Sequence, residues 1–429
     1  MSKTIITLVI LTIALIGMTS VANCSAGKLS FLHTNGSQIL NDMGKEVHLR
    51  GVNIGSWLLI EPWVLDVNDE KNNGFETEKD IWDFLDNRST KMNKLKLIRS
   101  FRDNWFTEND TKKIAALDMN CVRLPIWWRA TDESDYDGSF DYINQSIKRC
   151  NSSCLYVILD LHGAPGGQNN NNKILGEKSN PTDNLWNNIT LQNQFVEWWE
   201  KTANLYKNES NVAGYDILNE GTPKNFSDMT DLYNRTYHAI RNIDRKHIII
   251  LEVGDKSENL SLMPSPKEMR DMDWSNIIYS FHYYPTNCTD PDSFKTDFPH
   301  LKNASKQYDV PIYVGEFNTI QIQIDACNDG RLVRTLNPSE RLSLLKTYRD
   351  IFDDYGWSWT FWTYKKIERN PNYSWGLYGY ANETLTPDFK NNSLKEEDIE
   401  SAFEHMRTEN LGDLPAKAVF EKRPKREQQ

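Results

Sequence analysis

Two acidic residues, Glu220 and Glu316, stand at the ends of apolar stretches of the kind that form buried strands. Glu220 closes the stretch AGYDILNE (213–220), and Glu316 lies near the end of PIYVGEF (311–317). Because burying a carboxylate without partners is costly, we expect both side chains at the edge of the core. Two carboxylates across a ligand suit cleavage of a glycosidic bond. One protonates the leaving oxygen, and the other meets the positive charge that develops at the anomeric carbon.

Polar or aromatic residues also end nearly every other apolar stretch. They are Arg123, His162, Asn219, Glu252, His282, Tyr284 and Trp362. Arg123 would keep a nearby carboxylate ionised, while burial and repulsion from that anion would raise the pKa of the second carboxylate. We expect the two histidines to contact a ligand or to organise hydrogen bonds. No third residue has the sequence spacing of a metal site, so no metal is expected.

Two further acidic residues and several tryptophans have other expected roles. Strand alternation relative to Leu161 directs Asp160 away from the rim, which predicts a buried hydrogen-bond acceptor. Glu252 is expected to be structural or to support its neighbours. Sugars present apolar faces that aromatic rings match. The aromatic residues at or beyond strand ends that could line a sugar cleft are Trp127, Trp128, Trp362 and Trp375. For all of them except Trp362, partly buried packing is the favoured interpretation.

The elements that must position these residues alternate along the chain. Apolar, β-rich runs are predicted at 47–55, 120–128, 155–163, 213–220, 247–254, 276–284, 311–317 and 356–364. Amphipathic helices are predicted at 192–208, 228–244 and 340–355, each with one apolar face. In the first of them, Phe195, Trp198, Trp199 and Leu205 form that face.

Such an alternation predicts an α/β fold with a parallel sheet that is covered on both faces. Eight strands over this length point to a single closed (β/α)₈ TIM barrel, with a doubly wound open sheet as the alternative. In a barrel the carboxyl ends of all strands meet at one rim. Two strands separate the one that ends at Glu220 from the one that carries Glu316, so the two carboxylates could face each other over the mouth.

The composition indicates a globular protein and argues against polyanionic partners. The chain has 429 residues, of which 39% are hydrophobic, enough for a large core. Its net charge of -11 argues against nucleic acid or an anionic membrane as a partner.

The two ends of the chain differ from its middle. Residues 1–26 resemble a signal peptide, with Lys3, the apolar run ITLVILTIALIGM and the small residues Ser20-Val21-Ala22. An uncleaved signal anchor is the alternative. We therefore expect a secreted monomer that is free of the membrane after cleavage. Residues 27–400 would form the catalytic domain, and 401–429 a C-terminal helix with a disordered basic tail, KRPKREQQ.

Cysteines and sequons fit an exported protein. The six cysteines lack a zinc spacing and are expected to form one or two disulfides, whose pairing the sequence does not define. Cys121 could equally be a buried thiol. Cys288 and Cys327 follow the sixth and seventh predicted strands, and a disulfide between these two loops is as plausible as two free thiols. N-x-S/T sequons, each a candidate glycan site, include Asn35, Asn109, Asn151, Asn188, Asn234, Asn303 and Asn382.

Seven stretches together resemble glycoside hydrolase family 5, in particular its secreted exo-β-1,3-glucanases. They are LRGVNIGSWLLIEPW (49–63), VRLPIWW (122–128), LDLHGAPGGQN (159–169), DILNEG (216–221), FHYYP (281–285), VGEFN (314–318) and WSWTFWTY (357–364). The similarity runs from about residue 30 to residue 380. A single LNE would be a weak signal, whereas the ordered set is specific.

The resemblance implies a retaining double displacement on a (β/α)₈ barrel, without metal or cofactor, acting on a β-glucan polysaccharide or oligosaccharide. Glu220 would be the acid/base and Glu316 the nucleophile, with carboxyl groups about 5 Å apart. The family's other active-site residues would be Arg123, His162, Asn219, His282, Tyr284 and Trp362. Of these, Asn219 would hold the sugar 2-hydroxyl, Arg123 and Tyr284 the nucleophile, and His282 would lie near the acid/base.

Three departures from the family's pattern leave the linkage open. GEFN lacks the Trp that usually follows the Glu, NEGTP has no Pro directly after NE, and residues 168–173 replace a loop that usually shapes the sugar site. The sequence therefore predicts a secreted β-glucan hydrolase, most similar to a glucan exo-1,3-β-glucosidase. An endo-acting β-1,4-glucanase, a transglycosylase and a non-catalytic glucan-binding protein are the alternatives.

Overall fold

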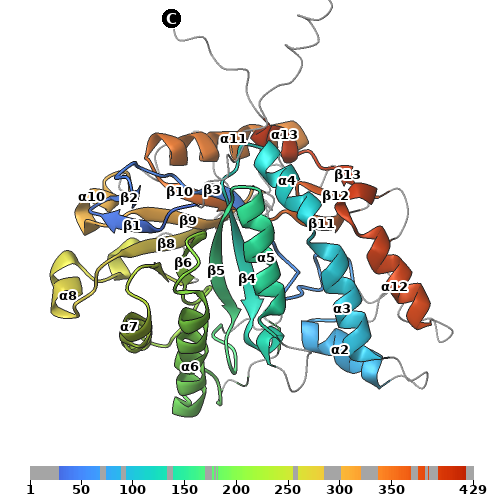
Figure 1. Cartoon of the computed structure of the whole chain (residues 1–429), viewed down its shortest axis with the longest axis horizontal. Coiled ribbons are helices and arrows are strands. Elements are labelled where there is room, and N and C mark those ends of the chain that lie inside the picture. The colour runs from blue at the N-terminus through green and yellow to red at the C-terminus, as the bar shows by residue number, and fades with distance from the viewer. Residues whose placement is uncertain are drawn as a thin grey trace, which may run out of the picture.

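Eight parallel strands close into a barrel in the computed structural model of the chain (Figure 1). Their order around the barrel is β10-β3-β4-β5-β6-β7-β8-β9. The strands are β3 (Arg50–Asn53), β4 (Cys121–Trp127), β5 (Tyr156–Gly163), β6 (Val212–Asp216), β7 (Ile248–Glu252), β8 (Ile277–Tyr283), β9 (Ile312–Phe317) and β10 (Ser358–Phe361). Seven of them fall within the predicted runs, and β6 begins one residue before its run, 213–220. The closed pairing of β10 with β3 confirms the (β/α)₈ barrel and excludes the open sheet.

The structure describes residues 29–67, 74–87, 93–132, 139–169, 176–177, 180, 182–254, 259–284, 301–319, 337–368, 375–381, 385 and 395–421. The predicted signal peptide, the tail KRPKREQQ and the pair Cys288 and Cys327 lie outside these residues.

Helices surround the barrel. They are α2 (Glu78–Asp86), α3 (Lys94–Trp105), α4 (Glu108–Ala116), α5 (Asp141–Ser152), α6 (Ile189–Tyr206), α7 (Phe226–Ile243), α8 (Pro266–Asp271), α10 (Ala304–Tyr308), α11 (Pro338–Asp354), α12 (Glu396–His405) and α13 (Lys417–Phe420). The three predicted helices correspond to α6, α7 and α11. Sequence signals explain the start of α11, where Asn337 and Glu340 form a capping box and Pro338 occupies the first turn. Among the helices that the structure describes, none is long and apolar enough to cross a bilayer.

One residue of the predicted apolar face of α6 is misplaced. Leu205 is 46% exposed, whereas Phe195, Trp198 and Trp199 are buried as predicted. The buried arc of α6 also includes Tyr206, and Leu205 lies just beyond the edge of that arc.

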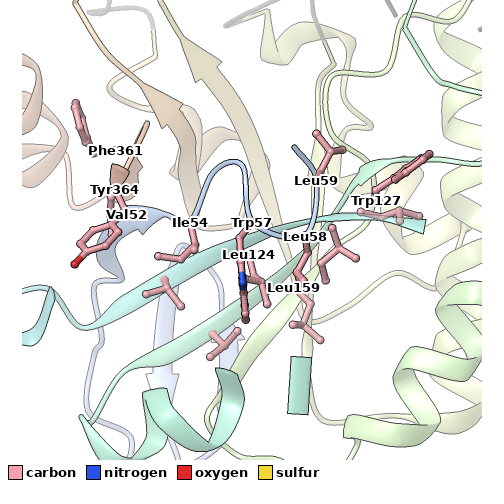
Figure 2. Packing of buried hydrophobic residues seen from close by; sticks show 14 of the residues in the cluster. Val52, Ile54, Trp57, Leu58, Leu59, Leu124, Trp127, Leu159, Phe361 and Tyr364 are labelled. Carbon is pink, nitrogen blue, oxygen red and sulfur yellow. The ribbon is translucent and has the colours of Figure 1, made fainter. Parts of the chain in front are cut away.

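The core extends from the barrel strands into the segment that follows β3. Figure 2 shows Trp57, Leu58 and Leu59 of this segment beside Leu124 of β4 and Leu159 of β5. The segment runs along β4, because the backbone N–H of Trp127 donates to the carbonyl of Leu58 at 2.9 Å. Burial of each large apolar side chain contributes about 1.5–3 kcal/mol, so this segment is held firmly at the carboxyl end of the strands.

A hairpin covers the opposite, amino end of the barrel. Strands β1 (Leu32–Asn35) and β2 (Gln38–Asn41) pair antiparallel. Their Leu32 and Ile39 belong to one buried cluster with residues from the first half of the barrel strands, among them Cys121, Tyr156 and Ile248. The hairpin thus leaves the carboxyl rim as the end of the barrel for a site.

The C-terminal part of the chain packs on the outside of the barrel. Helix α12 contacts α3, and Figure 1 shows the two side by side. A small sheet of β11 (Lys365–Glu368), β12 (Tyr378–Tyr380) and β13 (Gly412–Asp413) links this region to the barrel. The predicted domain boundary at residue 400 falls inside α12, so the folded unit continues beyond it.

The described cysteines include both thiols and a disulfide. Cys121 and Cys150 are free and buried, which confirms the buried-thiol reading of Cys121. Burial raises the pKa of both thiols, so they are inert apolar groups. Cys154 is disulfide-bonded.

Candidate active site

The structure brings all eight predicted site residues together at the carboxyl end of the barrel. They lie in or directly after β4 (Arg123), β5 (His162), β6 (Asn219 and Glu220), β8 (His282 and Tyr284), β9 (Glu316) and β10 (Trp362). The side chain of Glu220 is 19% exposed and that of Glu316 is 5% exposed. A ligand at the rim could therefore reach Glu220 first.

The two acidic residues face each other closely. A carboxylate oxygen of Glu220 and one of Glu316 lie within 4.8 Å of each other. Carboxyl groups about 5–5.5 Å apart are typical of retaining glycosidases, and inverting enzymes need about 6.5–9.5 Å for an intervening water. The geometry therefore fits direct attack by one carboxylate.

A ring nitrogen of His282 joins this pair within the same 4.8 Å. The sequence spacing did not reveal this grouping. The fold, and not the spacing along the chain, brings His282 to the site. Its Nδ1 already contacts Glu220 Oε1 at 2.8 Å, which gives the ring a hydrogen-bonding partner without a metal.

Two donors hold the carboxylate of Glu316. Arg123 Nη1 donates to Oε1 at 2.7 Å, and the hydroxyl of Tyr284 donates to Oε2 at 2.7 Å. Burial, and next the charge of Glu316, raise the pKa of Tyr284 well above its usual value, so the phenol stays protonated and can donate. Both oxygens of Glu316 are thereby oriented.

Glu220 occupies an unusual position in the loop after β6. Its backbone has φ +45°, in the left-handed region that a residue with a side chain rarely adopts. Burial raises the pKa of Glu220, although His162 and Arg123 oppose the shift. A carboxyl group that keeps its proton to higher pH is suited to general-acid catalysis.

Arg123 is the centre of a buried polar network. Its guanidinium contacts Asp160 at 3.1 Å and Asp216 at 2.8 Å, in addition to Glu316. Burial lowers the pKa of Arg123, but the three carboxylates more than offset this and raise it well above its usual value. The guanidinium therefore remains charged at the bottom of the site.

Carboxyl groups outnumber this single guanidinium. Burial raises the pKa of Asp160 to about 7 and that of Asp216 to about 6, although Arg123 lowers both. Asp160 accepts contacts from Arg123 and from His162 Nδ1 (2.7 Å). The predicted buried acceptor is thus confirmed. Asp216 was not identified from the sequence, because nothing distinguishes it from the surrounding apolar strand residues except its charge.

Asn219 presents an unused donor to the site. Its Oδ1 accepts from Arg123 Nη2 at 3.0 Å. Its Nδ2 is buried and has no hydrogen-bond partner among the described residues. A buried donor without a partner is rare in folded proteins, which makes this group available to a ligand hydroxyl.

His162 and Trp362 form one wall. Their rings stack with centroids 5.4 Å apart and an interplanar angle of 13°. Burial lowers the pKa of His162 to about 4, so the imidazole is neutral.

Glu61 is a site residue that the sequence reasoning missed. It follows β3 within the buried segment, and its Oε2 accepts from Trp63 Nε1 at 2.5 Å. Its Oε1 lies 4.0 Å from His162 Nε2, and its pKa is raised well above the usual value, first by burial and next by Glu316. Glu61 lies beyond the end of β3, so neither the alternation of side chains along a strand nor the position of a polar residue at a strand end could predict its place. Its place in the resembling stretch LRGVNIGSWLLIEPW was the available signal.

Gln168 supports the catalytic loops from behind. Its side-chain Nε2 donates to the carbonyls of His162 (2.7 Å) and Asn219 (3.0 Å). Asn169 Nδ2 likewise donates to the carbonyl of Glu220 at 3.3 Å. The described start of the Asn-rich segment therefore braces the backbone that carries the acid.

The tryptophans predicted to line a cleft divide into two groups. Trp127 is fully buried, so its ring belongs to the core, in line with the packing role that the sequence favoured for it. Trp128 is partly buried, with Arg129 over its ring at 4.6 Å. Trp375 contacts Tyr284, with ring centroids 5.7 Å apart, and therefore lies next to the site.

Known proteins resemble this chain in sequence. A family model described as cellulase (glycosyl hydrolase family 5) matches residues 85–367. A β-xylosidase from Phanerodontia chrysosporium is 24% identical over 356 residues, covering 79% of this chain and 71% of that protein. A probable glucan endo-1,6-β-glucosidase B from Aspergillus fumigatus is 25% identical over 60% of this chain and 71% of its own length. A probable glucan 1,3-β-glucosidase A from the same organism is 31% identical over 48% of this chain and 50% of its own length.

Solved structures agree in fold. A rutinosidase from Aspergillus niger has a TM-score of 0.58 at 15% identity, covering 75% of this chain and 90% of that one. The catalytic domain of an endoglucanase from Thermobifida fusca has a TM-score of 0.51 at 18% identity, covering 87% of this chain and 96% of that one. The family model spans well over half of the chain. The protein therefore belongs to glycosyl hydrolase family 5 and is a glycoside hydrolase.

Proposed function

We propose that this protein is a secreted retaining β-glucanase, and specifically a glucan exo-1,3-β-glucosidase. The observation that carries the proposal is the pair Glu220 and Glu316, whose carboxylate oxygens lie within 4.8 Å of each other in different surroundings. One carboxyl group is held by Arg123 and Tyr284, and the other has a raised pKa and greater exposure. This difference allows two chemical roles.

In the first step, Glu220 donates its proton to the glycosidic oxygen as the bond to the anomeric carbon breaks. The Glu316 carboxylate attacks that carbon from the opposite face and forms a covalent glycosyl-enzyme. In the second step, the Glu220 carboxylate removes a proton from water, and the resulting hydroxide displaces Glu316. Two inversions give net retention of the β configuration.

The neighbouring residues support these steps. Arg123 and Tyr284 orient the nucleophile, which places its oxygen for attack. The free Nδ2 of Asn219 is assigned to the sugar 2-hydroxyl, an interaction that strengthens in the transition state. Trp362, stacked on His162, offers a ring to the apolar face of the sugar.

The linkage assignment rests on similarity. The ordered family stretches most resemble exo-β-1,3-glucanases, and the relative named glucan 1,3-β-glucosidase A is 31% identical. Because another relative is named for endo-β-1,6 activity, the test must include that linkage.

The test compares four substrates: laminarin, carboxymethyl cellulose, a β-1,6-glucan and β-1,4-xylo-oligosaccharides. Glucose as the sole product from laminarin supports the proposal, and a β-anomer in the first product detected by NMR supports retention. Release of longer oligosaccharides, or a preference for another substrate, refutes exo-1,3 action. A labelled acceptor sugar that enters the products identifies a transglycosylase.

Glu316→Gln tests the nucleophile itself. We expect turnover to fall by at least about 10³-fold with substrate binding retained, since the amide cannot form the glycosyl ester. Asp244→Asn is the matched control, because Asp244 is a buried carboxylate remote from the site that bonds Tyr215 and His247. Unchanged turnover in Glu316→Gln contradicts the assignment, and binding without hydrolysis by the wild-type protein identifies a non-catalytic glucan-binding protein.

Secretion and a monomeric state are part of the proposal. Secretion is supported by the signal-like residues 1–26 and by the disulfide at Cys154, a bond favoured in oxidising compartments. N-terminal sequencing of protein from the culture medium tests cleavage, and light scattering tests the mass. Protein retained in the cell with residues 1–26 intact refutes secretion.

A further inference from the structure

Glu252 is a fully buried carboxyl group directly behind the acid/base. It is the last residue of β7, the strand between β6 and β8 in the barrel. Its Oε1 accepts a hydrogen bond from the backbone N–H of Glu220 at 3.0 Å. Its Oε2 lies 3.4 Å from His282 Nε2. Glu252 thus contacts both Glu220 and the imidazole that bonds the side chain of Glu220.

Both atoms of the Glu252–His282 contact lack other partners. Glu252 Oε2 and His282 Nε2 are buried, and neither makes a hydrogen bond to another described residue. A separation of 3.4 Å is slightly longer than a hydrogen bond, and a small approach would satisfy two buried polar atoms at once. A hydrogen bond between Glu252 Oε2 and His282 Nε2 requires a proton on one of these two atoms.

The other side of the imidazole shows where its own proton lies. His282 Nδ1 faces two carboxylate oxygens, at 2.8 Å from Glu220 Oε1 and 3.5 Å from Glu316 Oε2. Burial lowers the pKa of His282 to about 3, so the ring is neutral and carries one N–H. Since Nδ1 faces acceptors, the proton belongs on Nδ1, and Nε2 presents a lone pair to Glu252.

The charges around Glu252 favour its protonated form. The acidic groups that act on Glu252 are Asp216 on β6, Glu220 after β6 and Glu316 on β9. The neutral His282 lies on β8. Arg123 on β4 is the cation nearby, with Nη2 4.0 Å from Oε2, and it already bonds other carboxylates. From α7, the hydroxyl of Tyr233 donates to the Glu252 carbonyl. Burial, followed by Asp216 and Glu220, raises the pKa of Glu252 well above its usual value.

We propose that Glu252 is a positioning residue for the acid/base, which in its neutral form donates a hydrogen bond to His282 Nε2. The inference rests on the proposed role of Glu220. The donated bond fixes the imidazole tautomer with its proton on Nδ1, and Nδ1–H donates to Glu220 Oε1. The acidic proton of Glu220 is then confined to its other oxygen, which is free to meet the glycosidic oxygen.

The same residue also holds the backbone of the acid. The N–H of Glu220 donates to Glu252 Oε1, and this bond supports the left-handed conformation at φ +45°. One neutral carboxyl group therefore constrains Glu220 at two points, by its acceptor oxygen through the backbone and by its donor through the imidazole.

Glu252→Gln and Glu252→Leu separate this role from simple packing. The glutamine amide reproduces a neutral acid, since its oxygen accepts and its nitrogen donates, whereas leucine does neither. The readout is kcat/KM, which reports steps up to the glycosyl-enzyme, on a β-1,3-gluco-oligosaccharide and on 2,4-dinitrophenyl β-glucoside. The second substrate has a leaving group that needs no proton, so it bypasses the acid.

We expect Glu252→Leu to lower kcat/KM on the oligosaccharide by about 10²-fold and on the dinitrophenyl glucoside by less than about tenfold. Glu252→Gln is expected to lower kcat/KM by no more than about threefold, and the basic limb of its pH profile is expected at the same pH as in the wild type. Asp244→Asn, a buried carboxylate variant outside the site, controls for general destabilisation through its Tm.

Two results overturn the proposal. Equal losses on both substrates in Glu252→Leu show a structural role only. A basic limb that moves to lower pH in Glu252→Gln shows that the wild-type group is an anion, because removing an anion beside Glu220 lowers the pKa of Glu220. If Glu252→Leu does not fold, the pH profile of Glu252→Gln decides alone. Unchanged activity in Glu316→Gln and Glu220→Gln defeats the proposed function instead, so the two failures are distinguishable.

Discussion

Asn219→Ala tests how the site recognises the sugar ring next to the reacting carbon. The buried Nδ2 of Asn219 has no partner among the described residues. It therefore breaks no hydrogen bond within the protein when it donates to a hydroxyl of the sugar. A buried polar group that gains its partner recovers about 1–3 kcal/mol. At about 1.4 kcal/mol per factor of ten, we expect kcat/KM to fall about 5- to 150-fold.

The assay is a cycle of two proteins and two substrates. The kcat/KM of wild type and Asn219→Ala is measured on an aryl β-glucoside and on its 2-deoxy analogue. If Nδ2 bonds the 2-hydroxyl, the variant loses the full factor on the glucoside and little on the 2-deoxy substrate.

Asn53→Ala is the matched control. Asn53, like Asn219, accepts a hydrogen bond from Arg123 (3.1 Å), but its Nδ2 donates to the carbonyl of Gly315. Both variants remove one acceptor from the guanidinium, and Asn219 alone offers an unpaired donor. The reasoning is refuted if Asn219→Ala loses the same factor on both substrates, because the loss would then come through Arg123.

Two other predictions follow from the same geometry. The kcat/KM is expected to fall as pH rises through the pKa of Glu220, because its protonated form is the reactive one. Burial raises that pKa, so the basic limb should lie above the ordinary value of 4.5, and a limb at or below 4.5 in a pH–rate series contradicts the assignment. Gly254→Ala should lower kcat and not Tm alone. Gly254 has φ +82°, and an added Cβ would lie 2.3 Å from the carbonyl oxygen of Gly221, in the loop that carries Glu220. A variant with a lower Tm and unchanged kcat would show that this loop tolerates the shift.

Much of the barrel was predictable because each strand is a continuous apolar run. The strands β5 and β8 are buried along their whole length, and such short apolar runs are typical of strands that are covered on both faces. The rim residues followed from the same pattern, since a polar residue at the end of such a run must leave the core.

The rest depends on how the barrel closes, which local patterns do not contain. Asp216 lies inside an apolar strand, and only the closed barrel shows that it faces the guanidinium of Arg123 at 2.8 Å. Glu61 belongs to a loop whose path is defined by packing against β4. Trp127 lies at a strand end like the rim residues, yet its side chain lies in the core. Leu205 shows a similar limit for helices, because a residue at the edge of the predicted apolar face can be either buried or exposed to solvent.

The pairing of β10 with β3, which forms the seam of the barrel, joins strands that are synthesised at very different times. Trp359 pairs with Arg50 across it, and Phe420 of α13 covers the outside, with ring centroids 5.7 Å from Trp359 and 5.0 Å from Phe361. Closing so long a loop carries the largest chain-entropy penalty of any strand pair in the barrel. The nascent chain therefore leaves one edge of β3 unpaired until β10 has been synthesised, and α13 can pack over the closed seam only after that.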